Sequence, residues 1–392
     1  MKKIILFTLF ALSLVFGANR IGPVSEYGEL LAGAPSGKGY IYGSCKGINS
    51  GDEVQVRGMS LYWSLLDQAL EFWNADAVNT MVRDMKIEII RAAMATGNED
   101  WSGPAKGYGS DPDKQKNYVN TVVQAAIDND IYVIIDWHSH EANNQVESAK
   151  NFFREMAQKW GKYDNVIFEI FNEPQMVDWS VVKNYAEQIV PVIRQYSDNL
   201  IVVGTPQWSA TPNSAKDNKV TDSKNNIAYT FHYYACTHKT GTEGANVTKA
   251  MNAGLSVFVT EWGTGNADGS GDVTNCTDAN TRWQTFMNNN KLSWANWSAS
   301  MISEGTAAFY GGSSKNNLSY TPSGKAVKEY LSTNKTSYTK CGAVDIPSSS
   351  SEQIDRISMK PKTQKPSLLR KVYNAMGRLL EKTNNFQPFY EK

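Results

Sequence analysis

The chain has 392 residues, of which 41% are hydrophobic, enough to bury the core of one large domain with additional segments. Its 39 basic and 39 acidic residues balance, so no overall charge would attract nucleic acid or an anionic membrane. The composition therefore excludes a general nucleic-acid-binding protein. It also includes 11 Trp and 19 Tyr, a large supply of flat side chains that can stack on sugar rings.

Residues 1–17 have the pattern of a secretory signal peptide. Lys2 and Lys3 precede an apolar run, 4–16, that is too short to span a bilayer comfortably. Cleavage after Gly17 fits the small-residue rule, and a membrane anchor is the alternative. We therefore expect an exported, extracellular protein.

The region from residue 18 to about 52 is rich in glycine and small residues and predicts a short hairpin lid. Strand-like apolar runs and stretches of helical periodicity then alternate along the chain. The eight strand-like runs are 54–58, 86–94, 131–138, 166–174, 199–206, 227–235, 255–263 and 292–298. The helical stretches are 74–85, 113–129, 148–159, 178–196, 247–253, 279–289 and 325–332. This alternation predicts an α/β protein with a (β/α)8 TIM barrel, rather than a doubly wound sheet, in one domain over residues 18–334.

Two segments of different composition follow the predicted barrel. Residues 335–351 are interpreted as a linker because they include a serine run, 348–351. Residues 352–392 are basic, and their apolar side chains fall on one face of a helix. A basic amphipathic helix can bind the cell surface or a partner, and a solvated, weakly ordered tail is the alternative. The predicted barrel domain is expected to be a monomer.

The four cysteines predict disulfides rather than a metal site. None of Cys45, Cys236, Cys276 and Cys341 forms a C-x-x-C pair, which argues against zinc. In an exported protein, three disulfide pairings are possible. We favour Cys236–Cys276, tying two loops at one end of the sheet, with Cys45–Cys341 joining the N-terminal and C-terminal segments. Free buried thiols are the alternative.

Two apolar runs end in a glutamate. The run 166–174 finishes with Asn172, Glu173 and Pro174, and proline has no N–H to donate to a neighbouring strand. The run 255–263 carries Glu261 near its end in the same way. Barrels place their chemistry at the carboxyl ends of such strands, although a glutamate there can also simply cap the next helix. Two carboxylates on one sheet suggest acid/base or nucleophilic work on a glycosidic bond.

Other polar and aromatic side chains fall at the same ends of the predicted strands. They include Arg91, Tyr234 and Trp297, and all four histidines of the chain lie in only two of these stretches. The histidines are His138, His140, His232 and His238. Each of these residues alone could be structural, but together they predict one lined cleft.

Seven short motifs carry a resemblance to a known family. They are Arg57-Gly-Met-Ser60, Arg91-Ala-Ala-Met94, Asp136-Trp-His138, Asn172-Glu-Pro174, His232-x-Tyr234, Thr260-Glu-Trp-Gly263 and Ser293-Trp-Ala-Asn-Trp297. With these motifs in the family's order, the chain resembles glycoside hydrolase family 5, and most of all its bacterial endo-β-1,4-glucanases. The resemblance implies hydrolysis of internal β-1,4 links in cellulose or mixed-linkage β-glucan, with retention, through double displacement. A metal-dependent hydrolase is disfavoured because no cluster of ligands has the right spacing, and we expect no cofactor.

By this resemblance, Glu173 is the acid/base and Glu261 the nucleophile. A retaining enzyme needs its two carboxyls roughly 5–5.5 Å apart. The pKa of Glu173 is expected to be raised by burial and by the negative charge of Glu261, so that it is protonated before attack.

The resemblance also suggests roles for the remaining candidates. Arg91 and Tyr234 resemble the residues that aim the nucleophile, and Asn172 resembles the one that binds the sugar 2-OH. His138 and His232 resemble the histidines of the cleft, with His232 beside the acid/base. The substrate-binding candidates are Trp297 as a sugar platform, Trp63 and Trp208 on flanking sugars or in the core, and Glu304.

Two departures from the family bear on specificity. Ala95 stands where many relatives have tyrosine, and residues 298–302 lack a lysine that relatives often carry, although Glu304 remains. An endo-mannanase or xyloglucanase on the same scaffold is therefore the alternative activity. A non-catalytic glucan-binding barrel is a remote alternative, because such a protein would be expected to have lost a carboxylate.

Overall fold

The structure is a computed structural model that describes residues 20–97 and 107–342. The expected signal peptide (1–17), the serine run and the basic tail (352–392) lie outside the described residues. Within the described ranges, no helix combines the length and the apolar character that crossing a membrane requires.

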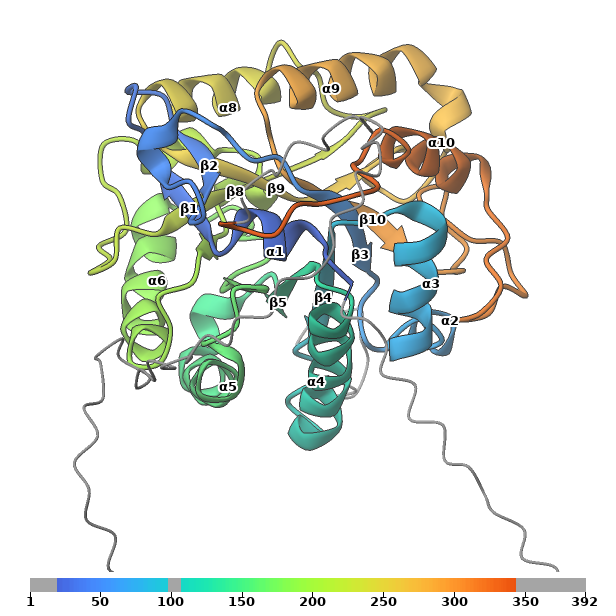
Figure 1. Ribbon diagram of the computed structural model, residues 1–392, viewed down its shortest axis with the longest axis horizontal. Coiled ribbons are helices and arrows are strands. Elements are labelled where there is room, and N and C mark those ends of the chain that lie inside the picture. The colour runs from blue at the N-terminus through green and yellow to red at the C-terminus, as the bar shows by residue number, and fades with distance from the viewer. Residues whose placement is uncertain (1–19, 98–106, 343–392) are drawn as a thin grey trace, which may run out of the picture. The chain divides into compact units, whose positions relative to one another are not determined.

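Eight parallel strands close into a barrel, which confirms the predicted (β/α)8 fold (Figure 1). The strands follow one another around the barrel in chain order, with the last pairing with the first. They are β3 (Arg57–Leu61), β4 (Ile89–Ala95), β5 (Tyr132–His138), β6 (Val166–Glu169), β7 (Ile201–Val203), β8 (Ile227–Tyr234), β9 (Ser256–Gly263) and β10 (Trp294–Ala299).

Two strands differ from their predicted bounds. β3 begins at Arg57, although Trp294 N–H donates to the Val56 carbonyl at 2.9 Å. Val54 and Val56 pack into an apolar cluster with residues of the N-terminal segment and of the starts of other strands. β6 ends at Glu169, well before Pro174, although Ile170 N–H still donates to the Val202 carbonyl in β7 at 3.1 Å. Glu173 therefore lies on the extended segment beyond β6 rather than within the strand.

Helices cover the outside of the barrel and bury their apolar faces against it. They are α2 (Asp67–Leu70), α3 (Ala75–Met85), α4 (Pro112–Asp128), α5 (Val146–Trp160), α6 (Trp179–Arg194), α8 (Glu243–Asn252), α9 (Thr277–Asn289) and α10 (Pro322–Leu331). Only the short α7 (Pro206–Ser209) and a 3-10 turn, η4 (Pro212–Ala215), connect β7 to β8.

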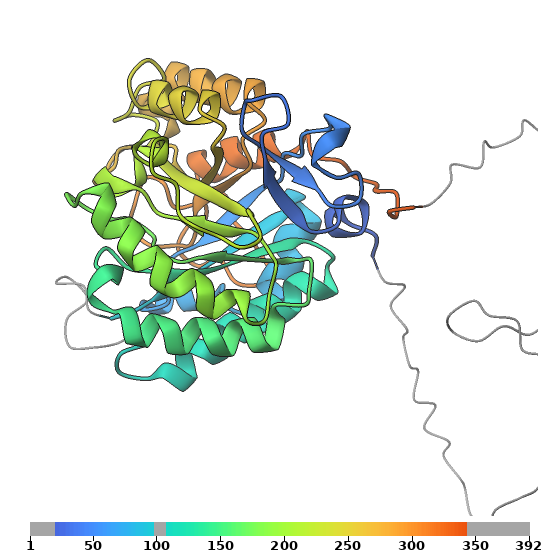
Figure 2. The same cartoon turned by 90° about the vertical axis from the view of Figure 1, so that its left-hand side faces the viewer.

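The N-terminal segment forms the expected hairpin, but at the end of the barrel where the strands begin. It consists of α1 (Pro23–Tyr27) and the antiparallel pair β1 (Leu30–Gly33) and β2 (Tyr40–Gly43), which Figure 2 shows together at one end of the barrel. Ala32 N–H donates to Asn226 Oδ1 at 2.8 Å, just before β8, and the Ser256 hydroxyl at the start of β9 donates to the Tyr40 carbonyl at 2.6 Å. The hairpin thus closes the bottom of the barrel and is not a lid over the strands' carboxyl ends.

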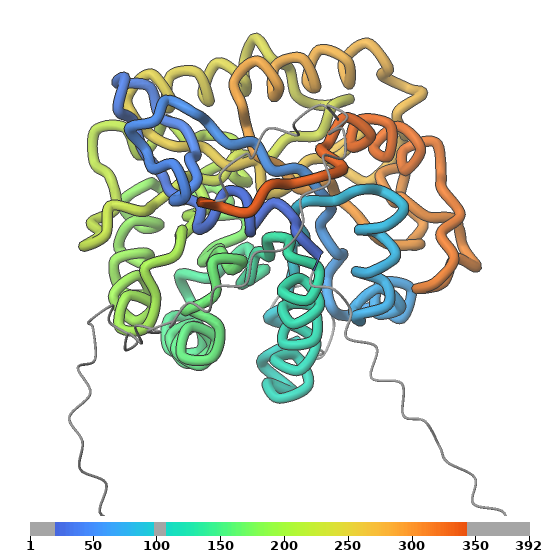
Figure 3. The backbone as a smooth tube through the Cα atoms, in the orientation of Figure 1, coloured from blue at the N-terminus to red at the C-terminus, as the bar shows by residue number. Residues whose placement is uncertain are grey.

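The C-terminal described residues, 335–342, run beside this N-terminal segment, as the tube in Figure 3 shows. Cys341 is bonded to Cys45 with a Cα–Cα distance of 5.7 Å, as favoured from the sequence. Tyr338 donates a hydrogen bond to buried Glu88 at 2.7 Å, and Cys341 N–H donates to the Ser25 carbonyl at 2.8 Å. Residues 335–342, which composition assigned to the linker, therefore pack against the barrel.

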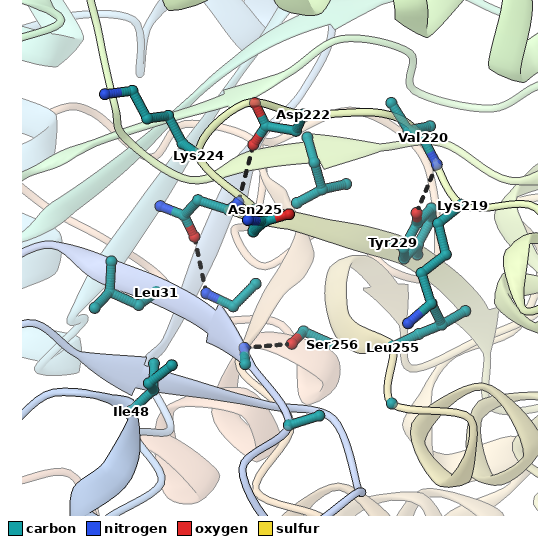
Figure 4. Close-up of a pocket in the computed structure, with 16 residues that line it drawn as sticks. Leu31, Ile48, Lys219, Val220, Asp222, Lys224, Asn225, Tyr229, Leu255 and Ser256 are labelled. Carbon is teal, nitrogen blue, oxygen red and sulfur yellow. Dashed lines mark hydrogen bonds between the residues drawn. The ribbon is translucent and has the colours of Figure 1, made fainter.

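A cavity of about 530 Å³ lies between β1 and the residues that lead into β8 and β9 (Figure 4). Two of its charged lining residues are engaged in ion pairs, Asp222 with Arg194 at 2.7 Å and Lys224 with Asp198 at 3.0 Å. This cavity is at the opposite end of the barrel from Glu173 and Glu261, so it is not the candidate catalytic site.

Candidate active site

Glu173 and Glu261 come together at the carboxyl end of the barrel. Glu261 lies in β9, and Glu173 lies beyond the end of β6. One carboxylate oxygen of each, together with one ring nitrogen of His232, lie within 4.8 Å of one another. The side chains are 13% and 5% exposed for Glu173 and Glu261, respectively, so both remain open to the cleft while largely shielded from water.

Arg91, in β4, joins the polar groups beneath the two carboxylates and is itself fully buried. Its Nη1 donates to Glu261 Oε2 at 2.8 Å, and its Nη2 donates to Asn172 Oδ1 at 2.7 Å. Its Nε and Nη2 donate to the two oxygens of Glu169 at 2.7 and 3.2 Å, and Nη2 lies 2.9 Å from Asp136 Oδ2. Burial opposes the guanidinium charge, but the three carboxylates outweigh it and raise the pKa of Arg91. One buried cation therefore holds Glu261 and Asn172 in place.

Asp136 and Glu169 belong to this network but were not assigned to the site from the sequence. Burial raises the pKa of each carboxyl to about 7, even though Arg91 lowers it. The available signal was an acidic residue within each of two apolar runs, Asp136 inside β5 and Glu169 at the end of β6, whose strand residues are all buried. Such a residue needs a buried partner, and Arg91 is that partner.

Glu261 has both carboxylate oxygens engaged. Arg91 donates to Oε2, and the Tyr234 hydroxyl donates to Oε1 at 2.7 Å. Gly263 makes room for Tyr234, because a Cβ there would lie 2.3 Å from the tyrosine ring. In the Glu-Trp-Gly sequence, Glu261 therefore supplies the carboxylate, and Gly263 leaves space for the Tyr234 ring whose hydroxyl orients it.

Glu173 contacts two histidines. His232 Nδ1 lies 2.8 Å from Glu173 Oε1, and His140 Nε2 lies 3.1 Å from Oε2. His138 instead contacts Asp136, with Nδ1 2.6 Å from Oδ2, and burial lowers its pKa well below the usual value. The sequence predicted that His140 lies near the cleft but gave it no role. Its contact with Glu173 joins residues that follow two different strands, so it forms only in the folded barrel.

The expectation of a raised pKa for Glu173 does not hold for this arrangement. Burial raises the pKa of the carboxyl. Hydrogen bonds and positive charge from His140 and His232 lower it by more than burial raises it, so the net pKa of Glu173 lies below its usual value. This lowering requires the histidines to act as donors, so the protonation of His232 decides how readily Glu173 holds a proton.

Aromatic side chains line the cleft around the two carboxylates. Trp297 is 4% exposed, stacks on the His138 ring at 5.3 Å between centroids, and lies 4.9 Å from the Tyr62 ring. Trp63 meets His138 edge-on at 4.0 Å. Tyr62 donates to Glu304 Oε1 at 3.2 Å, which places this carboxylate at the edge of the same cleft.

Trp208 lies on the other side of Glu173 and is 46% exposed. It belongs to three consecutive residues with left-handed φ values, 59° at Gln207, 53° at Trp208 and 59° at Ser209. Such a backbone costs on the order of 1–3 kcal/mol per residue. Hydrogen bonds to the segment that carries Glu173 stabilise this turn, from Trp208 N–H to the Pro174 carbonyl at 2.9 Å and from the Ser209 hydroxyl to the Asn172 carbonyl at 2.8 Å.

The second disulfide, Cys236–Cys276, has a Cα–Cα distance of 5.4 Å and links the segments that follow β8 and β9. The residues after β9 include Ala267 and Asp268, which line the cleft beside Glu173 and Tyr234. The disulfide therefore restrains the loop that forms one wall of the cleft.

Among the described residues, Glu173, His232 and Glu261 form a group of potential metal ligands, with one ligand atom of each within 4.8 Å of the others. All four carboxylate oxygens of this group already contact protein nitrogen or hydroxyl groups, from His232, His140, Arg91 and Tyr234. Each of these oxygens therefore has a protein hydrogen-bond partner.

Comparison with known proteins identifies the family of the chain. The family model for cellulase (glycosyl hydrolase family 5) matches residues 48–303. Endoglucanase Z from Dickeya dadantii is 45% identical over 289 residues, which are 72% of this chain but only 64% of that protein. An endoglucanase from Clostridium saccharobutylicum is 38% identical over 330 residues, covering 81% of this chain and 70% of that one.

Solved structures give the same result. The catalytic domain of the Thermobifida fusca endoglucanase Cel5A superposes with a TM-score of 0.70 at 30% identity, covering 80% of this chain and all (100%) of that domain. The barrel, the paired carboxylates and these matches place the chain in a single family: it belongs to glycosyl hydrolase family 5.

Proposed function

We propose that the protein is a retaining endo-β-1,4-glucanase that cleaves cellulose or mixed-linkage β-glucan. The observation that carries the proposal is the approach of Glu173 and Glu261, with an oxygen of each within 4.8 Å. Retaining glycosidases have their carboxyls roughly 5–5.5 Å apart, whereas inverting enzymes need about 6.5–9.5 Å to admit a water molecule.

Glu261 is the proposed nucleophile. Arg91 and Tyr234 each donate to one of its oxygens, which orients the carboxylate and stabilises its negative charge. One oxygen attacks the anomeric carbon while the bond to the departing sugar breaks, giving a covalent glycosyl ester. Water then attacks the same carbon and releases Glu261.

Glu173 is the proposed acid/base. It gives its proton to the departing glycosidic oxygen in the first step and takes a proton from the attacking water in the second. Asn172, one residue earlier, has its Oδ1 held by Arg91 at 2.7 Å, which directs its amide N–H groups toward other partners. That orientation suits donation to the sugar 2-OH, a contact that strengthens in the transition state.

The cleft suits a chain of sugars that extends past the site on both sides. A cavity of about 410 Å³ is lined by Trp63, Trp297, His138, Glu304 and both catalytic candidates, and a second of about 410 Å³ runs from Glu173 to Trp208. We assign Trp297, with Trp63 and Glu304, to the sugars on the side of Glu261. Trp208 is assigned to the departing side, because its cavity includes Glu173 but not Glu261.

A panel of polysaccharides tests the substrate directly. The glucanase is expected to act best on carboxymethyl-cellulose and barley β-glucan, as the endoglucanase names of the relatives suggest. The alternative of a mannanase or xyloglucanase would instead give dominant activity on glucomannan or xyloglucan. Absence of hydrolysis on the whole panel would leave the non-catalytic glucan-binding alternative.

The catalytic roles have their own test in variants. Glu173→Ala should lose activity on polysaccharide but recover turnover with azide and a substrate that has a good leaving group, because azide replaces the water that Glu173 activates. Failure of azide to rescue would count against the acid/base role.

We also propose export, on the basis of the leader-like residues 1–17 and two disulfides, which persist in oxidising compartments. The mature chain should begin at Ala18, which N-terminal sequencing of protein from culture medium would test. The proposed monomeric state can be measured by light scattering on the same sample.

A further inference from the structure

A chain of hydrogen bonds runs from Glu173 down into the barrel. His232 Nδ1 lies 2.8 Å from Glu173 Oε1, and His232 Nε2 lies 2.9 Å from the Thr260 hydroxyl oxygen. That hydroxyl lies 2.6 Å from Glu169 Oε1, and Glu169 receives two N–H groups of Arg91. Thr260 and Glu169 have no exposed surface, and His232 is 2% exposed, so no bulk water competes with these contacts.

The Thr260 hydroxyl fixes the direction of this chain because it carries a single hydrogen. When Glu169 is ionised, it can only accept, so Thr260 donates to it and must itself accept from His232. His232 then carries its proton on Nε2. A neutral His232 in that form offers only the Nδ1 lone pair to Glu173, and the hydrogen bond between them requires a proton on Glu173.

The opposite direction is available when Glu169 is protonated. Glu169 then donates to Thr260, the hydroxyl donates to His232 Nε2, and the imidazole proton lies on Nδ1. From there it is donated to Glu173, which must be an ionised carboxylate. The two arrangements contain the same number of protons and differ only in their positions, with one proton residing on Glu173 or on Glu169.

We propose that Thr260 and Glu169 are positioning residues that set, through the tautomer of His232, whether Glu173 carries the proton of the Glu173–His232 hydrogen bond. This inference rests on the proposed acid/base role of Glu173 and deepens it. When Glu169 is ionised, Glu173 carries the proton and can act as an acid. When Glu169 is protonated, Glu173 is ionised and has no proton to give.

The two ends of the chain are suited to such coupling. Burial raises the pKa of Glu169 to about 7, so both of its states are accessible near neutral pH. Arg91 favours the ionised state of Glu169 and hence the acid form of Glu173, whereas the lowered pKa of Glu173 belongs to the arrangement in which both histidines donate to it. Carboxyls that interact in this way titrate as a pair rather than one by one.

Other charged or titratable groups also face His232 from the surrounding elements and bear on its protonation. They are Glu261 in β9, Asp136 in β5 and His238 after β8, and Glu169 Oε1 itself lies 3.9 Å from His232 Nε2. None of them hydrogen-bonds to His232 in the described part of the chain, whereas Glu173 and Thr260 do.

Glu169→Gln tests the proposal most sharply. The shorter of the two Arg91 contacts, from Nε to Glu169 Oε2 at 2.7 Å, favours the amide oxygen of the glutamine at that position. Its NH₂ group then takes the Oε1 position that faces Thr260, and the longer contact from Arg91 Nη2 to Oε1, at 3.2 Å, is lost. The chain is thereby locked in the direction that leaves Glu173 ionised. Because general acid catalysis contributes about 10²–10⁴-fold, kcat/KM on cello-oligosaccharides should fall at least ~10-fold, and the pH profile should flatten on its alkaline side.

An activated substrate serves as the internal control. A dinitrophenyl cellobioside needs no protonation of its leaving group, so its kcat/KM in Glu169→Gln should stay within about threefold of wild type. An equal loss on both substrates would mean that the substitution acts through Arg91 and Glu261, and would overturn the proposal.

Thr260→Val and Thr260→Ser form a matched pair. Valine has nearly the same shape but no hydroxyl, so it should reduce oligosaccharide hydrolysis and shift the pH profile, again sparing the activated substrate. Serine keeps the hydroxyl and should restore the wild-type profile. A wild-type profile in Thr260→Val, or a serine variant as impaired as the valine one, would refute the role of the hydroxyl.

The tautomer can also be measured without any substrate. The chain has four histidines, so ¹⁵N-histidine labelling gives four imidazoles to assign. Above pH 7, His232 should be protonated at Nε2 and not at Nδ1, and in Glu169→Gln the reverse should hold. Protonation of Nδ1 in the wild type, or no change in the variant, would overturn the inference even if the protein proves to be an active glucanase. Conversely, an inactive protein with the expected tautomers would contradict the proposed function alone.

Discussion

Glu88 provides a test of the structure that is independent of catalysis. It lies at the bottom of the barrel, is 3% exposed, and accepts hydrogen bonds from the Tyr338 hydroxyl at 2.7 Å and from Arg57 N–H at 3.1 Å. Burial raises its pKa from 4.5 to about 6, although Tyr338 and Arg57 both lower it. The native state therefore binds this proton more tightly than the unfolded chain does.

The sign of the effect on stability follows directly. The contribution of Glu88 to the free energy of unfolding is greatest below pH 4.5, decreases as the pH rises toward about 6, and is constant above that. At 1.36 kcal/mol per pH unit, the difference amounts to about 2 kcal/mol. Glu88→Gln carries no charge, and its amide can still accept from Arg57 and donate to the Tyr338 oxygen. The variant should therefore match wild type near pH 4 and be more stable by about 2 kcal/mol near pH 8.

Urea denaturation followed by tryptophan fluorescence, from pH 4 to pH 8, measures this difference. Glu329→Gln, at an exposed position on α10, is the matched control for loss of a charge and should keep the wild-type slope. Tyr338→Phe should steepen the slope, because the phenol is one of the groups that lower the pKa of Glu88. A Glu88→Gln variant that is less stable than wild type at pH 8 would refute the reasoning.

Three further predictions concern the nucleophile, the disulfides and the cleft. Tyr234→Phe removes one of the two donors to Glu261, a charge-assisted bond worth about 1.5–3 kcal/mol, so kcat should fall ~10–100-fold in steady-state assays with folding unchanged by circular dichroism. Cys341→Ser opens a loop of 296 residues and should lower the unfolding free energy by ~6 kcal/mol, against ~4 kcal/mol for Cys276→Ser and its loop of 40; the opposite order in denaturant titrations would contradict the loop-entropy argument. Trp208→Ala should weaken the binding of long cello-oligosaccharides by about 1 kcal/mol, measured as a higher KM, and an unchanged KM would remove this residue from the cleft.

The barrel was predictable because its evidence is local. Each buried strand is a short apolar run, and the alternation of such runs with helical stretches fixes the fold class. The errors fell where local composition is not decisive. Val54 and Val56 look like strand residues but pack at the bottom of the barrel, and the hairpin read as a lid closes that same end.

The two candidate catalytic glutamates were also visible in the sequence, because each follows an apolar run directly. Their environment was not. Glu173 contacts His140 and His232, which are 33 and 59 residues away in the chain. Local sequence indicated burial, which raises a carboxyl pKa, but it could not indicate that two histidines would converge to lower it.

Asp136 and Glu169 also show that the sequence does not identify which residues meet in the folded protein. Each is an acidic residue within an apolar run, which signals a buried partner but does not identify it. Arg91 becomes that partner only when β4, β5 and β6 lie side by side in the closed sheet. Networks across strands therefore depend on the tertiary structure rather than on any one motif.

Trapping of the covalent intermediate tests the central claim most directly. A dinitrophenyl 2-deoxy-2-fluoro-cellobioside should form a glycosyl ester that hydrolyses slowly, because the fluorine destabilises both transition states. Peptide mass spectrometry is predicted to find one added fluorocellobiosyl group on the peptide that contains Glu261, and none in the Glu261→Ala variant. A label on any other residue, or an active enzyme that is never labelled, would contradict double displacement through Glu261.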